Sequence, residues 1–311
     1  MKKLLKVKEV PIFLVLLVGC LVVSILTPYF LKASNIFNVL RQIAVYAILA
    51  VGEALIIITG EIDLSIGYLM GLCGVLVALM AKAGLPAPVI FVLTLAFGAA
   101  VSSVAGILVT RFGINSFIAT LGIQNICRGA SLLLTGGIAI MVKSPIAVLG
   151  SGYIGKMPIC SIIMLAVIFL FAWFVHSTQL GRNIFAVGSN FTASKFAGVN
   201  SEAVKTKAFA ISGALVGLCG IISYGTLKAA DPTAGAGYEL DAVAAVVIGG
   251  TSMAGGEGTI IGVLIGAAIM GVLKNAFVLL KISAYWQVIV LGVVIIAAVF
   301  LDSVKRLRAE K

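Results

Sequence analysis

Residues 158–176, PICSIIMLAVIFLFAWFVH, contain no Asp, Glu, Lys or Arg over the length of a membrane crossing. A helix needs about 20 apolar residues to cross the hydrocarbon core of a bilayer. Other stretches share this character, although those at 239–253 and 257–276 are short and interrupted by glycine. The sequence therefore predicts about ten transmembrane helices. They are expected at 10–28, 42–60, 63–81, 88–110, 115–136, 158–176, 204–226, 239–253, 257–276 and 284–302.

The composition of the whole chain supports a membrane location. Of 311 residues, 61% are hydrophobic and 11% are charged, and the mean hydropathy is +1.22. Soluble domains are about 45–50% apolar with about 25% charged residues, so no soluble core would hide this much apolar surface. We therefore predict an all-α polytopic membrane protein, a single transmembrane domain over residues 1–311, with membrane lipid as its solvent.

The distribution of basic residues predicts the orientation. The chain has 22 Lys and Arg against 11 Asp and Glu, and cytoplasmic loops of membrane proteins carry an excess of Lys and Arg. We predict that both termini and the polar loop at about 177–207 are cytoplasmic, which requires an even number of spans. The residues on this side are Lys2, Lys3, Lys6, Lys8, Arg111, Arg182, Lys195, Lys205, Lys207, Lys305, Arg306, Arg308 and Lys311, while Lys32, Arg41, Lys82, Lys143, Lys156 and Lys228 fall outside.

Several chemical functions are disfavoured. The basic residues are spread between apolar runs, which predicts no nucleic-acid partner. Residues 150–157, GSGYIGKM, resemble a phosphate-binding loop, but Met157 replaces the Ser or Thr that would hold magnesium, so we predict no ATP or other cofactor on this chain. With one histidine, His176, and no HExxH or GxSxG motif, we predict no catalytic residues. The five cysteines lack a CxxC pair, so no metal site is expected.

Glycines recur four residues apart in three places, which puts them on one face of a helix. Small residues let helix backbones approach closely in lipid, where no hydrophobic force joins the helices. Close packing inside one bundle explains most of these glycines, and one stripe could form a seam between two copies of the chain. The stripes are Gly67 and Gly71, Gly213 and Gly217, and Gly258, Gly262 and Gly266.

Two glycine-rich breaks carry polar residues at membrane depth, GEIDLSIG at 60–67 and GGTSMAGGEG at 249–258. Irregular backbone is tolerated there only if it is buried in protein or lines a water-filled path. Asp63 and Glu257 either cap the helices that follow, whose N-termini favour negative charge, or take part in gating.

The surroundings of the two breaks also echo one another. Residues 50–76 and 243–273 each consist of an apolar run, a glycine-rich break and a second helix rich in glycine. In the topology above both units run from outside to inside and back, which suggests a parallel repeat of two helices.

The expected span at 115–136 contains several polar residues. Arg128 is the only cation well inside a predicted span, and burying it unpaired would cost several kcal/mol. It therefore snorkels, faces water along a polyol path, or pairs with Glu53 or Asp241. The candidate residues of a substrate pathway or gate are Asp63, Ser65, Asn115, Phe117, Gln124, Asn125, Arg128, Asp241 and Thr251.

The cytoplasmic loop contains a short apolar element. Asn190 is a suitable N-cap and Gly198 a suitable terminator for a helix over 191–197. A merely solvated loop would not need the apolar side chains found here, so the element is suited to docking onto a soluble partner. These side chains are Phe185, Phe191, Phe196 and Val199.

Five motifs together resemble one family over nearly the whole chain. They are GEIDLSIG at 60–67, FIATLG at 117–122 followed by Arg128 and Gly129, LGRNIFAVG at 180–188, YELDAVAAVVIGGTS at 238–252, and GGEGT at 255–259. They look like the permeases of monosaccharide-type ATP-binding-cassette (ABC) importers, with the autoinducer-2 permeases as near relatives. The block at 238–258 is highly specific. The chain departs from the family at Glu61, where relatives often have glycine, and at Glu53, which is unusual.

The resemblance implies a non-catalytic permease subunit in the bacterial cytoplasmic (inner) membrane. A second permease copy or a paralogue, cytoplasmic ATP-binding subunits that hold ATP and magnesium, and an extracytoplasmic sugar-binding protein would complete the importer. Its cargo would be a monosaccharide, ribose or a similar simple sugar. The loop at 181–200 is similar to the family's coupling loop, which inserts into the ATPase. The residues expected in this coupling are Gly181, Arg182, Ala186, Gly188, Asn190, Ala193, Phe196, Ala197 and Gly198.

The charged residues leave a second class of transporter open. Ionisable groups inside a membrane often form relays in carriers that use an ion gradient. Such a carrier would lose uptake in the presence of an uncoupler, would ignore ATP and would need no partner subunits. The candidates for the relay are Glu53, Asp63, Arg128, Asp241 and Glu257.

Overall fold

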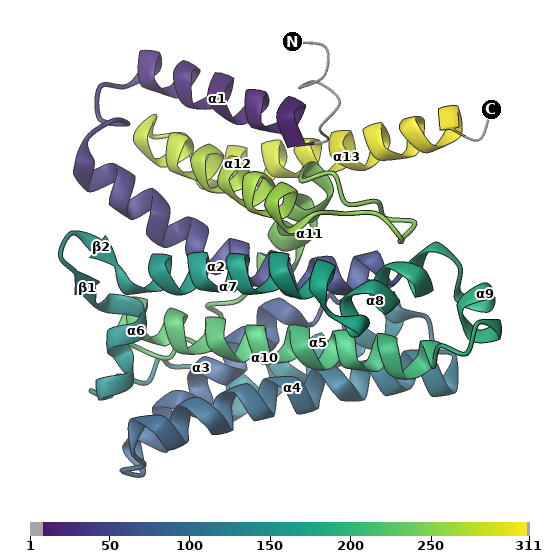
Figure 1. Ribbon diagram of the computed structural model, residues 1–311. Helices are drawn as coiled ribbons and strands as arrows, with labels where there is room; N and C mark the ends of the chain where they lie inside the picture. Colours follow the sequence, from purple (N-terminus) through teal and green to yellow (C-terminus); the bar gives the residue numbers. More distant parts are fainter. Residues whose placement is uncertain (1–8, 310–311) are drawn as a thin grey trace.

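The computed structural model describes residues 9–309, which fold into a bundle of helices (Figure 1). Each predicted span coincides with one long helix. The predictions for Lys2, Lys3, Lys6, Lys8 and Lys311 lie outside the described residues. The long helices are α1 (Glu9–Leu26), α2 (Ala33–Ile58), α3 (Ile66–Lys82), α4 (Ala87–Phe112), α5 (Ser116–Thr135), α7 (Ile159–Ser177), α10 (Ser201–Leu227), α11 (Tyr238–Ile248), α12 (Ile260–Leu279) and α13 (Ala284–Ala309).

Seven of the described helices are long and apolar enough to cross a membrane, namely α1, α2, α4, α5, α7, α10 and α12. Shorter apolar helices cover Ile66–Lys82 and Ala284–Phe300. The chain is therefore a multi-pass, all-α membrane protein. Helix α11 has 11 residues, about 16 Å at 1.5 Å per residue, or half of a hydrocarbon core. It stops at Ile248 because Gly249 and Gly250 begin the break, so the helix expected over 239–253 is shorter than predicted.

Helices α2 and α10 form the centre of the bundle. In the most apolar part of α2, 89% is buried, and α10 packs against α2, α3 and α4. At the opposite extreme, only 6% of α1 is buried, and its main neighbour is α12. In Figure 1, α1 accordingly lies at the edge of the bundle. The apolar side chains that α1 exposes would contact lipid.

The glycine stripes pack inside the bundle. At Gly213, Gly266 and Gly67 an added Cβ would overlap the backbone carbonyl of a neighbouring element. The prediction of close packing within one chain is confirmed for these stripes, which join elements of this chain. Gly258 precedes α12 and belongs to the break. The contacts are Gly213 with Gly98 of α4, Gly266 with Ala245 of α11, and Gly67 with Gly235 of the segment before α11.

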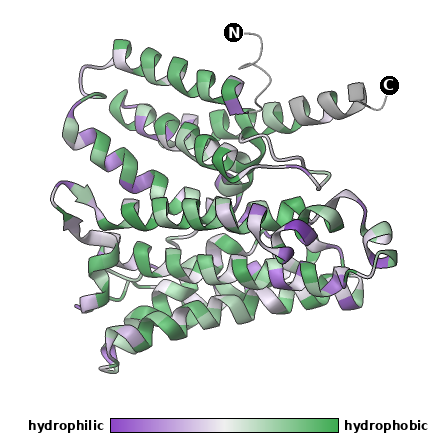
Figure 2. Ribbon diagram, viewed as in Figure 1, coloured by the Kyte–Doolittle hydropathy of each residue, from purple (hydrophilic) through white to green (hydrophobic). Residues whose placement is uncertain are grey.

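Short elements occupy the two ends of the bundle. Helices α8 (Gln179–Ser189) and α9 (Phe191–Phe196) lie at the end where α1 begins and α13 ends (Figure 1). The opposite end carries α6 (Val148–Ser151) and the antiparallel strands β1 (Tyr153–Ile154) and β2 (Met157–Pro158), preceded by the 3-10 turn η2 (Pro145–Ala147). Residues 150–157 thus contribute to a helix end and a hairpin. Hydrophobic residues dominate the long helices, and hydrophilic ones are prominent around α8 and α9 (Figure 2).

Candidate functional site

The two glycine-rich breaks meet at the end of the bundle that carries α8. We call residues 58–65, which begin with the last residue of α2, the first break and residues 249–259 the second break. The N–H of Gly256 donates to the carbonyl oxygen of Ile58 at 2.8 Å, which joins the second break to the end of α2. Gly60 and Gly256 have φ angles of 83° and 75°, in the left-handed region that glycine adopts without strain. Glycine is therefore required here by backbone conformation.

Helix α8 packs against both breaks through Gly188. An added Cβ at this position would overlap the carbonyl oxygen of Ile58 and lie 2.6 Å from the nitrogen of Gly256. Ile184 and Val187 of the same helix are buried in the core. The predicted coupling residue Gly188 therefore joins α8 to the end of α2 and to the second break.

Helix α9 forms an exposed tip beyond α8. The side chain of Asn190 accepts a hydrogen bond from the N–H of Ala193 at 2.8 Å, and Gly198 follows the helix with a φ of 84°. The predicted cap and terminator are confirmed. Phe196 at this tip is 88% exposed. Of the other expected coupling residues, Arg182, Ala186, Ala193, Ala197 and Gly198 are exposed, and Gly181 is buried against α7.

The first break contains buried polar side chains that are hydrogen-bonded. Asp63 and Ser65 are both fully buried, and Asp63 Oδ1 accepts hydrogen bonds from the N–H of Ser65 at 2.8 Å and from its Oγ at 2.6 Å. Glu53 Oε1 accepts from the N–H of Asp63 at 3.0 Å, and the N–H of Leu64 donates to Thr120 Oγ1 at 3.1 Å. In this conformation Asp63 and Ser65 are enclosed by protein and line no open path. Asp63 binds the residue that precedes α3.

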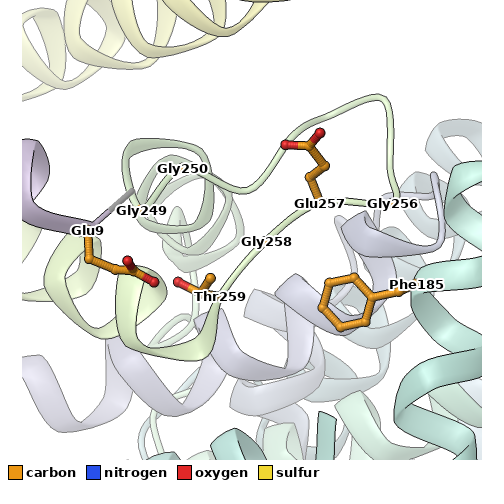
Figure 3. A pocket seen from close by; sticks show the side chains of 8 residues that line it. All are labelled: Glu9, Phe185, Gly249, Gly250, Gly256, Glu257, Gly258 and Thr259. Carbon is orange, nitrogen blue, oxygen red and sulfur yellow. The ribbon is translucent and has the colours of Figure 1, made fainter. Parts of the chain in front are cut away.

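The second break lines a pocket of about 280 Å³ (Figure 3). Its walls come from the start of α1, from Phe185 of α8 and from both ends of the break. The interpretation of Glu257 as the cap of α12 is wrong, because Thr259 is the N-cap and its Oγ1 accepts from the N–H of Gly262 at 3.0 Å. Thr251, expected on the pathway, is fully buried, and its Oγ1 has no hydrogen-bond partner.

Helix α5 combines polarity with exposure. Its hydropathy of 1.3 is the lowest of the seven described candidate spans, yet only 28% of it is buried. By contrast, the exposed helix α1 has a hydropathy of 2.7. Polar and charged side chains are costly in the hydrocarbon region, so a lipid contact alone does not suit α5. The exposed predicted residues on α5 and at its start are Asn115, Phe117, Asn125 and Arg128.

Sequence comparison identifies the family of this helical bundle. Residues 35–299 match the family described as branched-chain amino acid transport system / permease component. The chain belongs to this permease family. No solved structure matches the permease.

Named relatives cover almost the whole permease. The ribose import permease protein RbsC of Escherichia coli (strain K12) is 42% identical over 297 residues, 94% of this chain and 92% of the relative. RbsC of Bacillus subtilis (strain 168) is 39% identical over 296 residues, with the same coverage of 94% and 92%. The D-allose transport system permease protein AlsC of Escherichia coli (strain K12) is 34% identical over 294 residues, 93% of this chain and 90% of the relative.

Two contacts tie α5 of the permease to its neighbours. Gln124 Nε2 donates to Glu239 Oε1 of α11 at 3.1 Å, and the guanidinium of Arg128 lies 5.6 Å from the ring centroid of Tyr68. The alternative in which Arg128 pairs with Glu53 or Asp241 is wrong for the described residues, because Glu53 is fully buried with the N–H of Asp63 as its partner and Asp241 pairs with Lys274. Arg128 is exposed, and its described contact is with an aromatic face.

Sequence reasoning missed a polar cluster between α2, α11 and α12 of the permease. The rings of Tyr46 and Tyr238 stack with centroids 4.9 Å apart. The ammonium of Lys274 donates to Tyr46 Oη at 3.2 Å and pairs with Asp241, which is 6% exposed. Arg128 is therefore not the only cation well inside a helix. The sequence analysis expected this span to end at residue 276, which placed Lys274 at its end. Helix α12 continues to Leu279, so Lys274 lies farther inside the helix than expected.

Proposed function

We propose that this permease is the membrane-spanning subunit of an ABC importer that carries a monosaccharide, ribose or a similar simple sugar, into the bacterial cytoplasm. The observation that supports this most is the 42% identity to a ribose import permease over 94% of the chain. The subunit would be non-catalytic and would hold no cofactor. A cytoplasmic ATP-binding subunit would bind ATP and magnesium, an extracytoplasmic sugar-binding protein would deliver the sugar, and a second permease copy or a paralogue would complete the pathway.

The proposed topology has ten crossings with both termini in the cytoplasm of the cell. Helix α11 would complete its crossing with the segment at 228–237, whose Gly235 packs on Gly67 of α3. The start of α1, the end of α13 and helices α8 and α9 lie at one end of the bundle, which agrees with a cytoplasmic position for all of them (Figure 1).

Coupling would begin at the exposed tip formed by α9. Phe196 and Ala193 are exposed there and would contact the ATP-binding subunit. A displacement of α9 would move α8, and Gly188 would press directly on the backbone of both breaks. The pocket of about 280 Å³ beside Phe185 leaves space into which the second break can move. A movement of the ATP-binding subunit would thus reach the two breaks through α9, α8 and the backbone contacts of Gly188.

The sugar path would run along the exposed face of α5, between two permease copies. Hydrogen-bonding groups and aromatic faces are what a polyol requires, and Asn115, Asn125, Arg128 and Phe117 supply both. A second copy or water in front of this face would remove Arg128 from contact with lipid. We expect Arg128→Ala to lower sugar uptake about tenfold with an unchanged unfolding temperature, and full uptake would contradict this role.

Purification and reconstitution test the proposal together. The tagged permease, extracted from native membranes in mild detergent, should co-purify with an ATP-binding subunit identified by mass spectrometry. Proteoliposomes that contain this complex and its binding protein should take up labelled ribose only with ATP, even with an uncoupler present. Uptake that ignores ATP and collapses with the uncoupler would instead support the ion-coupled carrier, which membership of this permease family does not favour.

A further inference from the structure

Two carboxyl groups meet inside the bundle, those of Glu53 on α2 and Asp63 in the first break. Both residues are 0% exposed, and the N–H of Asp63 donates to Glu53 Oε1 at 3.0 Å. The remaining oxygens, Glu53 Oε2 and Asp63 Oδ2, are buried and have no hydrogen-bond partner. Buried polar atoms are almost always hydrogen-bonded, so the orphaned oxygens of these two joined residues need an explanation.

The described part of the chain offers no cation to this pair. Its ion pairs join Lys195 to Glu202, Lys205 to Glu61 and Lys274 to Asp241, while Arg128 lies over Tyr68. Besides Glu53, the described ionisable group that interacts electrostatically with Asp63 is the thiol of Cys127 on α5, which supplies no positive charge. Two adjacent buried carboxylates would repel one another and would lack solvation.

The two groups are not equivalent. Asp63 Oδ1 accepts two hydrogen bonds from Ser65, and Asp63 precedes the N-terminus of α3, where the helix dipole favours negative charge. Among the described residues, the one hydrogen bond that Glu53 receives comes from the N–H of Asp63, and Glu53 lies within α2. The surroundings therefore stabilise a carboxylate on Asp63 more than one on Glu53.

We propose that Glu53 and Asp63 form a binding site for one proton, held mainly on Glu53. The proton turns one orphaned oxygen into a donor, leaves the other as an acceptor, and lowers the charge of the pair from two to one. It keeps the first break closed beside Ile58, the residue whose carbonyl contacts Gly188 of α8. The inference concerns the resting protein and does not depend on which solute the permease carries.

Infrared spectroscopy of the purified permease at neutral pH tests the site directly. We expect the carbonyl band of a protonated carboxylic acid, and we expect Glu53→Gln to reduce its intensity; Glu239, whose Oε2 is also buried without a hydrogen-bond partner, would account for any remainder. Glu61→Gln is the matched control, because Glu61 is ion-paired with Lys205 at 2.5 Å and should leave the band unchanged. A membrane-permeant carbodiimide, which reacts with protonated buried carboxyls, should label Glu53 but not Glu61 in peptide mass spectrometry.

Thermal unfolding distinguishes a proton at the Glu53 and Asp63 site from another bound cation such as sodium. Glu53→Gln, which replaces the acid by a neutral donor of the same shape, should unfold within about 2 °C of the native protein, whereas Glu53→Ala should unfold at a clearly lower temperature. Equal losses in both variants, or a band whose intensity Glu53→Gln leaves unchanged, would overturn the proposal. So would a sodium-dependent rise in unfolding temperature that Glu53→Gln removes, because the site would then hold sodium.

Discussion

The two glycine-rich breaks are alike in sequence and different in surroundings. The centre of the first break is enclosed, with Asp63 and Ser65 fully buried and hydrogen-bonded to one another. The second break lines an open pocket of about 280 Å³ beside Phe185. After the first break α3 packs on α4, α5 and α10, whereas after the second break α12 returns along α11. Both units thus have the predicted order of helix, break and helix, but they pack against different neighbours.

This difference indicates two mechanical roles. A buried, hydrogen-bonded break resists displacement, because any movement leaves polar groups without partners. A glycine-rich break beside open space can change shape at lower cost. Helix α8 touches both through Gly188, so a movement of α8 would be resisted by the first break and absorbed by the second.

The largest expected effect comes from Gly188→Val. The new side chain would collide with the backbone of Ile58 and Gly256, and backbone cannot rotate away as a flexible side chain can. We expect ATP-driven sugar uptake in proteoliposomes to fall at least tenfold, with a lower unfolding temperature. Ala186→Val, at an exposed position on α8, is the control for stability and should unfold as the native protein does. Native uptake by Gly188→Val would show that α8 does not press on the breaks.

The next prediction concerns the ion pair between Asp241 of α11 and Lys274 of α12, the helices on either side of the second break. Lys274→Met leaves the nearly buried Asp241 without its cation, which we expect to lower the free energy of unfolding by about 3–5 kcal/mol. The double variant Asp241→Asn/Lys274→Met should recover most of this loss, because no buried charge remains unpaired. Chemical denaturation in detergent measures all three proteins. A single variant as stable as the native permease would mean that the pair does not hold α11 to α12.

A smaller effect compares one serine from each break. Ser65→Ala removes a buried hydrogen bond of 2.6 Å to Asp63 and should lower the free energy of unfolding by about 1–3 kcal/mol. Ser252→Ala removes only an exposed contact of 3.3 Å with the N–H of Ala254, and its effect should stay within about 0.5 kcal/mol. Equal losses in the two variants would contradict the contrast between an enclosed and an open break.

The features predicted correctly are those that depend on neighbouring residues along the chain. An apolar run long enough to cross a membrane favours a helix whatever packs against it, so the ranges of the helices followed from composition. The ends of α9 followed from Asn190 and Gly198, because capping is a contact within a few residues. The glycine spacing likewise predicted close packing, without showing which helices would approach.

The features that sequence reasoning missed join residues far apart in the chain. Asp241 pairs with Lys274 and Glu53 with Asp63 because α12 lies along α11 and because the first break folds back over α2. Gly188 reaches both breaks only because three loops converge at one end of the bundle. Apolar length and capping are local properties that amino-acid order dictates. The partners of buried charges depend on which helices are neighbours, and packing in three dimensions decides that.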